Sequence, residues 1–236
     1  MQLKLMSFNI QHCLNYISRE VDYPFFSEKI AEFGADIVVL NEVRDQGRDL
    51  EYDPQTKILA DCAGYPYYYF AEAIKFGGVN PYGNAILSRF PIISADTLTI
   101  PDPVPRGYDG YYETRCVARA VIDVGTPLTV LGVHFGLNPD EHENARDTIL
   151  ANISPERCVL MGDFNSHPDD PIIAPIFGRM TDAASAFDGE KLSFPSDVPK
   201  EKIDYIFVTP DIKVVEADIP AAVISDHRPH TATVEF

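Results

Sequence analysis

The sequence predicts an α/β protein with a mixed sheet architecture and helices on the outside. Two observations indicate this fold class. Short apolar segments rich in β-branched residues recur along the chain, and segments with helical periodicity lie between runs of them. Polar residues directly follow several of the apolar segments, which predicts a functional site at the strand ends, where loops rest on a rigid frame.

The N-terminal part predicts a strand–helix–strand unit. Residues 3–8 and 36–40 have the apolar character of strands, and residues 24–33 form an amphipathic helix that Gly34 can end. Residues 44–57 are mostly polar, and we expect a loop there.

The middle of the chain predicts an antiparallel meander followed by a second helix. Gly, Pro and Asn separate five expected strands, at residues 67–70, 84–87, 92–100, 115–122 and 128–133. The second helix begins after Asn138, carries Ala145, Ile149 and Ile153 on its apolar face, and leads to a strand at 158–161. The remaining strands are expected at residues 205–208, 213–217 and 231–236. No linker is evident, so we expect one domain over residues 1–236.

Residues 101–113 form a Pro-rich segment that interleaves Arg106 with Tyr108, Tyr111 and Tyr112. Two interpretations remain open for it. It is either a lid that contacts the substrate or a solvated loop with surface tyrosines.

Composition restricts the compartment and the cysteine chemistry. No basic leader with a following apolar run is present, and no stretch approaches about 18 consecutive apolar residues, so we expect a cytoplasmic protein with no membrane partner. Four scattered cysteines lack a CxxC spacing, which favours free, buried thiols over a zinc site or disulfides.

The net charge of −17 helps to indicate which class of substrate the protein binds. Proteins that bind long nucleic acids gain affinity by neutralising phosphates, and an acidic surface repels such a polymer. The charge therefore favours a small phosphorylated substrate over long duplex nucleic acid. An acidic surface also keeps proteins soluble, so charge alone decides nothing.

The segment Met161-Gly-Asp-Phe-Asn-Ser-His-Pro168 is the most informative polar motif. If the backbone stays extended, Asp163 and Asn165 point the same way and face one reacting group. The carboxylate can accept a proton from water, and the amide can donate to a phosphoryl oxygen. The alternative is an Asx-turn, in which both residues serve only the local backbone.

Seven short motifs in order resemble the endonuclease/exonuclease/phosphatase superfamily. They are SFN at 7–9, VLNEV at 39–43, YGNAILSRFPI at 82–92, GVHFG at 132–136, GDFNS at 162–166, KIDYIFV at 202–208 and SDH at 225–227. The resemblance implies a four-layer α/β sandwich of two packed, mostly antiparallel sheets. It also implies a metal-dependent phosphoesterase with its site at one end of the sandwich.

For the metal, the resemblance implies that Glu42 is the principal ligand of a Mg²⁺ ion, with Asn9 beside it and Asp226 nearby. Mn²⁺ can substitute. Oxygen donors are the ligands that Mg²⁺ prefers, and a sparse set suits an ion that keeps several waters.

For catalysis, the resemblance implies that Asp163 positions or activates water and Asn165 binds the phosphoryl oxygen. His227 would contact the phosphate while Asp204 fixes its tautomer, and His134 would face the leaving group. The expected reaction is in-line attack of water on phosphorus, with Asp163 or His227 as general base.

Some positions are weaker candidates or depart from the family pattern. Arg115 is a weak candidate for substrate binding, because an Arg near a phosphate site can bind it bidentately or serve a structural ion pair. Gln11 stands where some relatives carry a further acidic ligand, and Asn41-Glu42 replaces the common Gln-Glu.

Three functions are carried forward from the sequence. The first is hydrolysis of a small soluble phosphorylated substrate, the second is a nuclease for short single-stranded DNA or RNA, and the third is a catalytically silent binding module. The sequence leaves open the oligomeric state, the number of metal ions and the choice between phosphodiester and phosphomonoester.

Overall fold

Two six-stranded sheets pack face to face in the computed structural model, which describes residues 1–47 and 52–236. The first sheet has the order β11 (Lys213–Asp218), β12 (His230–Glu235), β1 (Gln2–Asn9), β2 (Ile37–Arg44), β4 (Asn80–Ser88) and β3 (Tyr67–Phe76). The second has the order β5 (Ile92–Thr99), β6 (Cys116–Asp123), β7 (Pro127–His134), β8 (Cys158–Asp163), β10 (Asp204–Val208) and β9 (Thr181–Asp182).

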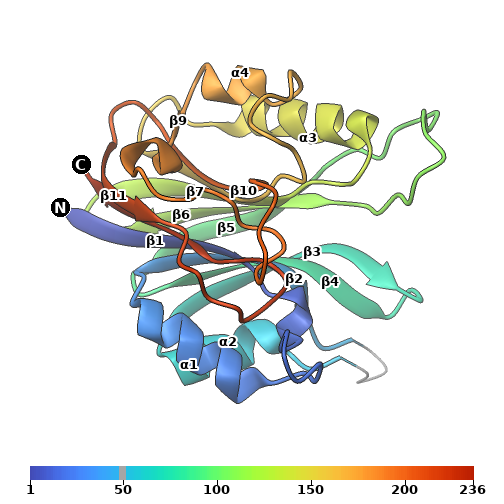
Figure 1. The fold of residues 1–236 in the computed structure, drawn as a ribbon, viewed down its shortest axis with the longest axis horizontal. Helices are drawn as coiled ribbons and strands as arrows, with labels where there is room; N and C mark the ends of the chain where they lie inside the picture. The colour runs from blue at the N-terminus through green and yellow to red at the C-terminus, as the bar shows by residue number, and fades with distance from the viewer. Residues whose placement is uncertain (48–51) are drawn as a thin grey trace.

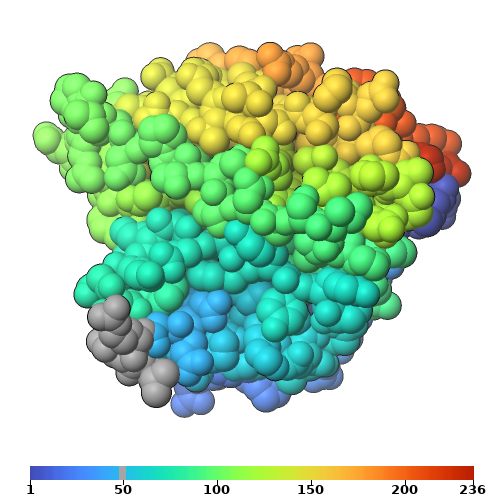
Figure 2. Space-filling view, turned by 180° about the vertical axis from the view of Figure 1, so that it is seen from behind, coloured from blue at the N-terminus to red at the C-terminus, as the bar shows by residue number. Residues whose placement is uncertain are grey.

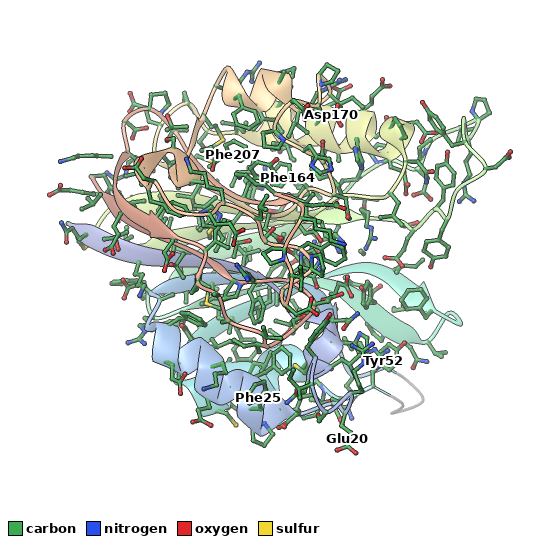
Figure 3. All side chains as sticks on the ribbon, viewed as in Figure 1. Glu20, Phe25, Tyr52, Phe164, Asp170 and Phe207 are labelled. Carbon is green, nitrogen blue, oxygen red and sulfur yellow. The ribbon has the colours of Figure 1, made fainter. Side chains whose placement is uncertain are left out.

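Helices cover the outer face of each sheet, which completes four layers (Figure 1). The helices are α1 (Tyr23–Phe33), α2 (Gln55–Ala63), α3 (Pro139–Asn152) and α4 (Ala174–Phe177), with short 3-10 turns at η1 (Gln11–Cys13) and η2 (Ala183–Ala186). One apolar cluster lies between α1, α2 and the first sheet. Another, which includes Phe164 and Phe207, lies between the second sheet and the helices α3 and α4 (Figure 3). The predicted α/β sandwich is confirmed.

Each sheet contains one parallel pair of strands, and this pair sets the position of the strand ends. β1 and β2 are parallel and joined through α1, while β7 and β8 are parallel and joined through α3. The other pairings are antiparallel. Parallel strands need such a crossover, and both of their carboxyl ends then lie at the same edge of the sheet.

The apolar core between the sheets follows the two-residue period of the strands. Leu3 and Leu5 of β1, Ile37 and Val39 of β2, and Val159 and Met161 of β8 belong to one inner cluster. The intervening residues of these strands pack under the helices instead. Because successive side chains point to opposite faces, the same rows continue to Ser7 and Asn9 on β1, to Asn41 on β2 and to Asp163 on β8. The polar residues therefore continue the rows of the inner core.

Most expected elements are present, and the differences have local causes. Helix α1 ends at Gly34, whose φ of 62° is in the left-handed region, as predicted. Helix α2 was not predicted, because its start lies inside the polar segment expected to be a loop. Of that segment, residues 48–51 lie outside the described residues. Strands β3 and β4 extend further than expected and meet at Gly77 and Gly78.

Residues 101–113 contain neither helix nor strand and reach beyond the edge of the sandwich, as the segment before β6 in Figure 1 and the projecting green atoms of Figure 2 show. The N-terminal end of α3 anchors the segment. Asp140 accepts hydrogen bonds from Gly107 N at 2.9 Å and from the Tyr112 hydroxyl, and Asn138 Nδ2 donates to Tyr111 O at 2.8 Å.

The cysteines are free, and no helix of residues 1–47 and 52–236 is long and apolar enough to cross a membrane. Cys13, Cys116 and Cys158 are buried, as predicted, whereas Cys62 on α2 is exposed. Burial raises the pKa of Cys116 to about 12 and that of Cys158 to about 11, and it raises the pKa of Cys13 as well.

The buried amide of Asn41 links the two sheets at the site end. Its Nδ2 donates to Asn84 Oδ1 on β4 and to Val133 O on β7, both at 2.8 Å, and its Oδ1 accepts from Asp163 N on β8 at 3.1 Å. Asn41 has no exposed surface. Buried polar groups are costly when unpaired, so these three bonds fix how β7 and β8 lie against β2.

We expect Asn41→Ala to lower the free energy of unfolding by about 3 kcal/mol, because it leaves buried donors and acceptors without partners. Urea denaturation followed by circular dichroism measures this loss. The control is Asn144→Ala, whose exposed Nδ2 donates to Pro101 O and should contribute below about 1 kcal/mol. Equal effects of the two substitutions would contradict the bridging role of Asn41.

We expect an aromatic disulfide reagent to modify Cys62 alone in the native protein. The thiolate is the reactive form, and burial both covers the other three thiols and disfavours their ionisation. Absorbance of the released thiol measures the count before and after denaturation, and Cys62→Ser should remove the fast phase. Rapid modification of a second thiol in the native state would contradict this assignment.

Candidate active site

The polar site lies where the two parallel strand pairs end. In the first sheet Asn9 pairs with Asn41, and in the second sheet His134 pairs with Asp163. Asp204, the first residue of β10, pairs with Asp163 from the other side. The ends of strands from both sheets thus bring together residues that are far apart in the sequence.

The carboxylate of Asp163 is the centre of the cluster. Its Oδ2 accepts from Asn9 Nδ2 at 3.0 Å, and it lies 3.6 Å from His134 Nε2 and 3.5 Å from His227 Nε2. Only 1% of Asp163 is exposed. Burial raises the pKa of Asp163 to about 7, the charge of His227 lowers it, and the Asp204 carboxylate raises it.

His227 and Asp204 form a buried couple. His227 Nδ1 donates to Asp204 Oδ2 at 2.8 Å, which directs Nε2 toward Asp163. The ring of Phe194 packs against the imidazole, with the centroids 4.7 Å apart. Burial lowers the pKa of His227, but the Asp204 and Asp163 carboxylates outweigh it and raise that pKa to about 10. His227 is therefore an imidazolium at neutral pH.

His134 lies near the same oxygen of Asp163 as His227 does, but its surroundings shift its pKa in the opposite direction. Its Nδ1 lies 3.1 Å from Arg115 Nη1, and Arg115 in turn forms a buried ion pair with Glu113. Burial, the charge of Arg115 and the charge of His227 hold the pKa of His134 well below its usual range. His134 is therefore neutral.

Glu42 reaches the cluster through a β-bulge. Because Asn41 faces the inner core, a regular strand would turn Glu42 to the opposite face. The pairing of β2 with β4 instead shifts between Leu40 and Val43, and Glu42 adopts φ 59°. Its Oε1 then accepts from Asn9 Nδ2 at 3.0 Å. The strained backbone at this position re-aims the carboxylate.

Asn165 differs from the extended arrangement expected from the sequence. Strand β8 ends at Asp163, Asn165 has φ 45°, and its backbone N donates to Asp163 Oδ1 at 2.9 Å. This is the Asx-turn. It is favoured over the extended arrangement because it gives the backbone N–H of Asn165 an acceptor where the strand ends. The side chain of Asn165 stays half-buried beside the site, where Nδ2 donates to Phe135 O at 3.1 Å.

Asp226 and Arg115 lie near the cluster, but neither forms a hydrogen bond or ion pair with Asp163 or Glu42 among the contacts of the described residues. Asp226 accepts from Ser225 Oγ at 2.9 Å, and its charge helps to raise the pKa of the adjacent His227. Arg115 is engaged with His134 and Glu113. Among the described residues, the group whose potential ligand atoms lie within 4.8 Å of one another is Asp163, Asp204 and His227.

The donor chemistry of the site fits a hard divalent cation beside Glu42. Five carboxylates gather here, namely Glu42, Glu113, Asp163, Asp204 and Asp226, against the cations of Arg115 and His227. Carboxylate oxygens suit Mg²⁺ or Mn²⁺, and an added cation would offset the excess negative charge. Asn9 Nδ2 donates to the carboxylates of Glu42 and Asp163, while its Oδ1 accepts from Gln11 N. Coordination of a metal by this oxygen therefore requires rotation of the amide.

Sequence reasoning assigned no site role to Asn84, Tyr82 or Glu113. Asn84 and Tyr82 lie on inner positions of β4, and Asn84 Nδ2 donates to Cys116 O at 3.0 Å. A hydrogen bond with Glu42 contributes to the raised pKa of Tyr82, after burial and the charge of Glu42. The two-residue period of β4 could have indicated Asn84 and Tyr82, because it places them on the same inner face as Ile86.

Comparison with solved structures shows the same fold in several bacterial proteins. An endonuclease/exonuclease/phosphatase from Beutenbergia cavernae is 20% identical with a TM-score of 0.79, over 99% of this chain and 71% of that one. One from Bacteroides vulgatus is 21% identical with a TM-score of 0.77, over 100% and 99% of the chains. The Bacteroides thetaiotaomicron mannosyl-6-phosphatase Bt3783 is 17% identical with a TM-score of 0.75, over 99% and 100%.

A search of curated proteins found no match. The model of the Endonuclease/Exonuclease/phosphatase family, in contrast, matches residues 6–227, which span the site from Asn9 to His227. Members of this family are phosphoesterases. The chain therefore belongs to the endonuclease/exonuclease/phosphatase family.

Proposed function

We propose that this protein is a divalent-metal-dependent phosphoesterase that hydrolyses a small soluble phosphorylated substrate by direct attack of water. The family supports phosphoester chemistry. The observation that carries the proposal is the Asp163 carboxylate, which is buried between one neutral and one charged histidine and hydrogen-bonded to Asn9.

Glu42 and Asp226 would hold the metal through carboxylate oxygens, and Mg²⁺ is the expected ion with Mn²⁺ as a substitute. Asn9 orients Glu42 and Asp163 through Nδ2, or coordinates through Oδ1 once its amide turns. When bound, the cation neutralises charge on the phosphate oxygens.

The protonation states favour Asp163 over His227 as the general base. His227 is held as an imidazolium by Asp204 and Asp163, so it has no free lone pair with which to accept a proton. Asp163 has a pKa near the working range of a base, and its Oδ2 faces the site. We therefore assign proton removal from the attacking water to Asp163.

The remaining side chains would bind the phosphoryl group. His227 directs a charged N–H into the site, where it stabilises negative charge developing on phosphoryl oxygens. His134 is neutral and would face the leaving group. Asn165 would donate to a phosphoryl oxygen by exchanging its bond to Phe135 O.

The charge of the chain supports a small substrate over a long duplex. At −17 the protein lacks the excess of basic residues that phosphate backbones require. The structurally similar Bt3783 carries the name mannosyl-6-phosphatase, which also points toward soluble phosphates. The cytoplasmic location stays a prediction, which free thiols support because disulfides are rare in that compartment.

We expect the protein to hydrolyse p-nitrophenyl phosphate or its bis ester with Mg²⁺ or Mn²⁺, and to stop when the metal is chelated. Glu42→Gln and Asp163→Asn should each lower kcat by about 100-fold or more, since they remove the expected ligand and base. Release of p-nitrophenolate measures the rate. Asp147→Asn, an exposed carboxylate on α3, is the control with unchanged activity. Wild-type inactivity with every metal, or full activity of Asp163→Asn, would remove the proposal.

We expect sugar phosphates or nucleotides to be turned over faster than oligonucleotides, because the acidic surface repels polyanions. Phosphate release from a panel of sugar phosphates, nucleotides, phospholipid headgroups and short single-stranded oligonucleotides measures this order at fixed ionic strength. Turnover confined to oligonucleotides would replace the small-substrate proposal with the nuclease alternative.

A further inference from the structure

Arg115 contacts the edge of the His134 ring that points away from Asp163. Its Nη1 lies 3.1 Å from His134 Nδ1, and Nε2 on the opposite side of the ring lies 3.6 Å from Asp163 Oδ2. A guanidinium carries only donors and stays charged in proteins. A short contact between it and an imidazole nitrogen is therefore favourable only when that nitrogen is bare and accepts.

Glu113 holds Arg115 in this position. The carboxylate forms an ion pair with Arg115 Nη1, and the exposed fractions of the two side chains are only 8% and 10%. Glu113 is itself fixed from two directions, because its backbone N donates to Glu141 Oε1 and its Oε2 accepts from the Tyr111 hydroxyl at 3.2 Å. The guanidinium is thus anchored on one side and directed at the histidine on the other.

The contact selects one of the two neutral forms of His134. With Nδ1 accepting, the ring proton must sit on Nε2, which faces Asp163 and the reacting centre. The other tautomer would oppose a ring N–H to a guanidinium N–H in a buried place, with neither donor satisfied.

We infer that the Glu113–Arg115 pair sets the tautomer of His134, so that a neutral His134 donates from Nε2 to the phosphorylated substrate beside Asp163. This inference rests on the proposed function. It makes Arg115 a positioning residue that acts through His134. Of the two roles that the sequence left open, phosphate binding and a structural ion pair, Arg115 forms the ion pair. Burial and the charge of Arg115 also lower the pKa of His134, which keeps the ring neutral.

The direct test is nitrogen-15 NMR of the imidazole groups at neutral pH, because the two ring nitrogens differ in chemical shift according to which one carries the proton. The His134 signals are assigned by their loss in His134→Gln. We expect wild-type His134 to show a protonated Nε2 and a bare Nδ1. Arg115→Met should release the ring to a mixture of both tautomers, and Arg115→Lys, which still donates, should keep part of the wild-type form.

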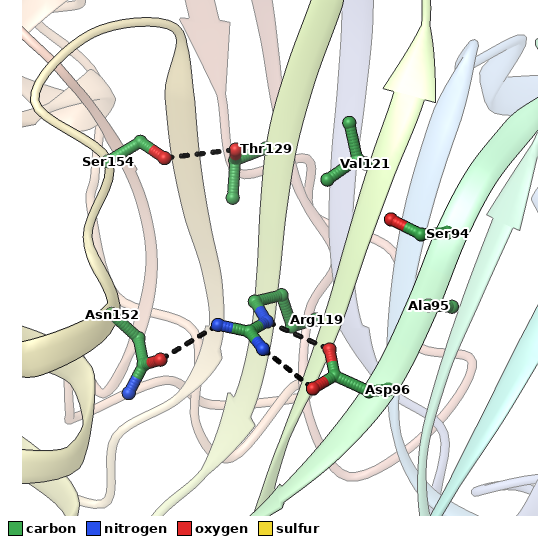
Figure 4. A pocket seen from close by; sticks show the side chains of 8 residues that line it. All are labelled: Ser94, Ala95, Asp96, Arg119, Val121, Thr129, Asn152 and Ser154. Carbon is green, nitrogen blue, oxygen red and sulfur yellow. Dashed lines mark hydrogen bonds and ion pairs between the residues drawn. The ribbon is translucent and has the colours of Figure 1, made fainter.

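Kinetics supply the second readout. We expect Arg115→Met to lower kcat by about 10-fold or more while KM changes little, since a hydrogen bond directed at the reacting group is weakened. Arg119→Met is the matched control, on strand β6, which Arg115 directly precedes. Arg119 pairs with Asp96 and Asn152 in an outer cavity of about 440 Å³ (Figure 4), so its loss should leave the His134 signals and kcat unchanged.

An unchanged His134 tautomer in Arg115→Met would overturn the inference, and so would a rise in KM with unchanged kcat, which marks a direct phosphate ligand. Should Arg115→Met fail to fold, Glu113→Gln tests the same anchor by removing its charge, and a wild-type tautomer there overturns the inference equally. The NMR result needs no turnover. Inactive wild-type protein with a responsive tautomer would remove the proposed function and leave the tautomer assignment standing.

Discussion

The site depends on one buried amide, that of Asn41. Both sheets contribute polar residues to the site, and a buried polar link across the inner core holds Asp163 of the second sheet against the first. Asn41 supplies that link by donating to Asn84 and Val133 and accepting from Asp163. Because the backbone N of Asp163 is one of its partners, the amide joins the two sheets and also fixes the residue on which the proposed chemistry rests.

The same strand geometry that builds the core also delivers the site. Inner positions of β1, β2, β7, β8 and β10 are apolar along much of each strand and become polar toward the end that lies at the site. The hydrophobic rows determine the register, and a slip of one residue would turn every inner side chain outward. Burial of Leu5, Val39 and Met161 therefore aligns Asn9, Asn41 and Asp163 at no separate cost. Glu42 is the exception, and it needs a bulge with φ 59° to join them.

The period and order of the strands could be predicted from the sequence, and so could the position of Asn9, His134 and Asp163 at strand ends, with His227 shortly before the last strand. Three kinds of feature could not. The Asx-turn at Asn165 was one of two local options, and only the strand end at Asp163 decides between them. The contacts of Arg115 with His134 and Glu113 join residues whose pairing no local pattern indicates. Helix α2 was concealed by the polar residues at its start, although Gly64 ends it in the left-handed conformation.

The two histidines show how one carboxylate can face both a donor that is charged and a donor that is neutral. His227 and His134 lie at similar distances from Asp163 Oδ2, yet their pKa values move in opposite directions. The difference comes from the far side of each ring. Asp204 behind His227 favours the imidazolium, and Arg115 behind His134 disfavours it. Two charged histidines would repel each other, and two neutral ones would leave the Asp163 and Asp204 carboxylates without the imidazolium that now lies between them. The two partners thus give the two rings different functions. His227 compensates the negative charge of the carboxylates, and His134 donates a hydrogen bond without carrying a charge.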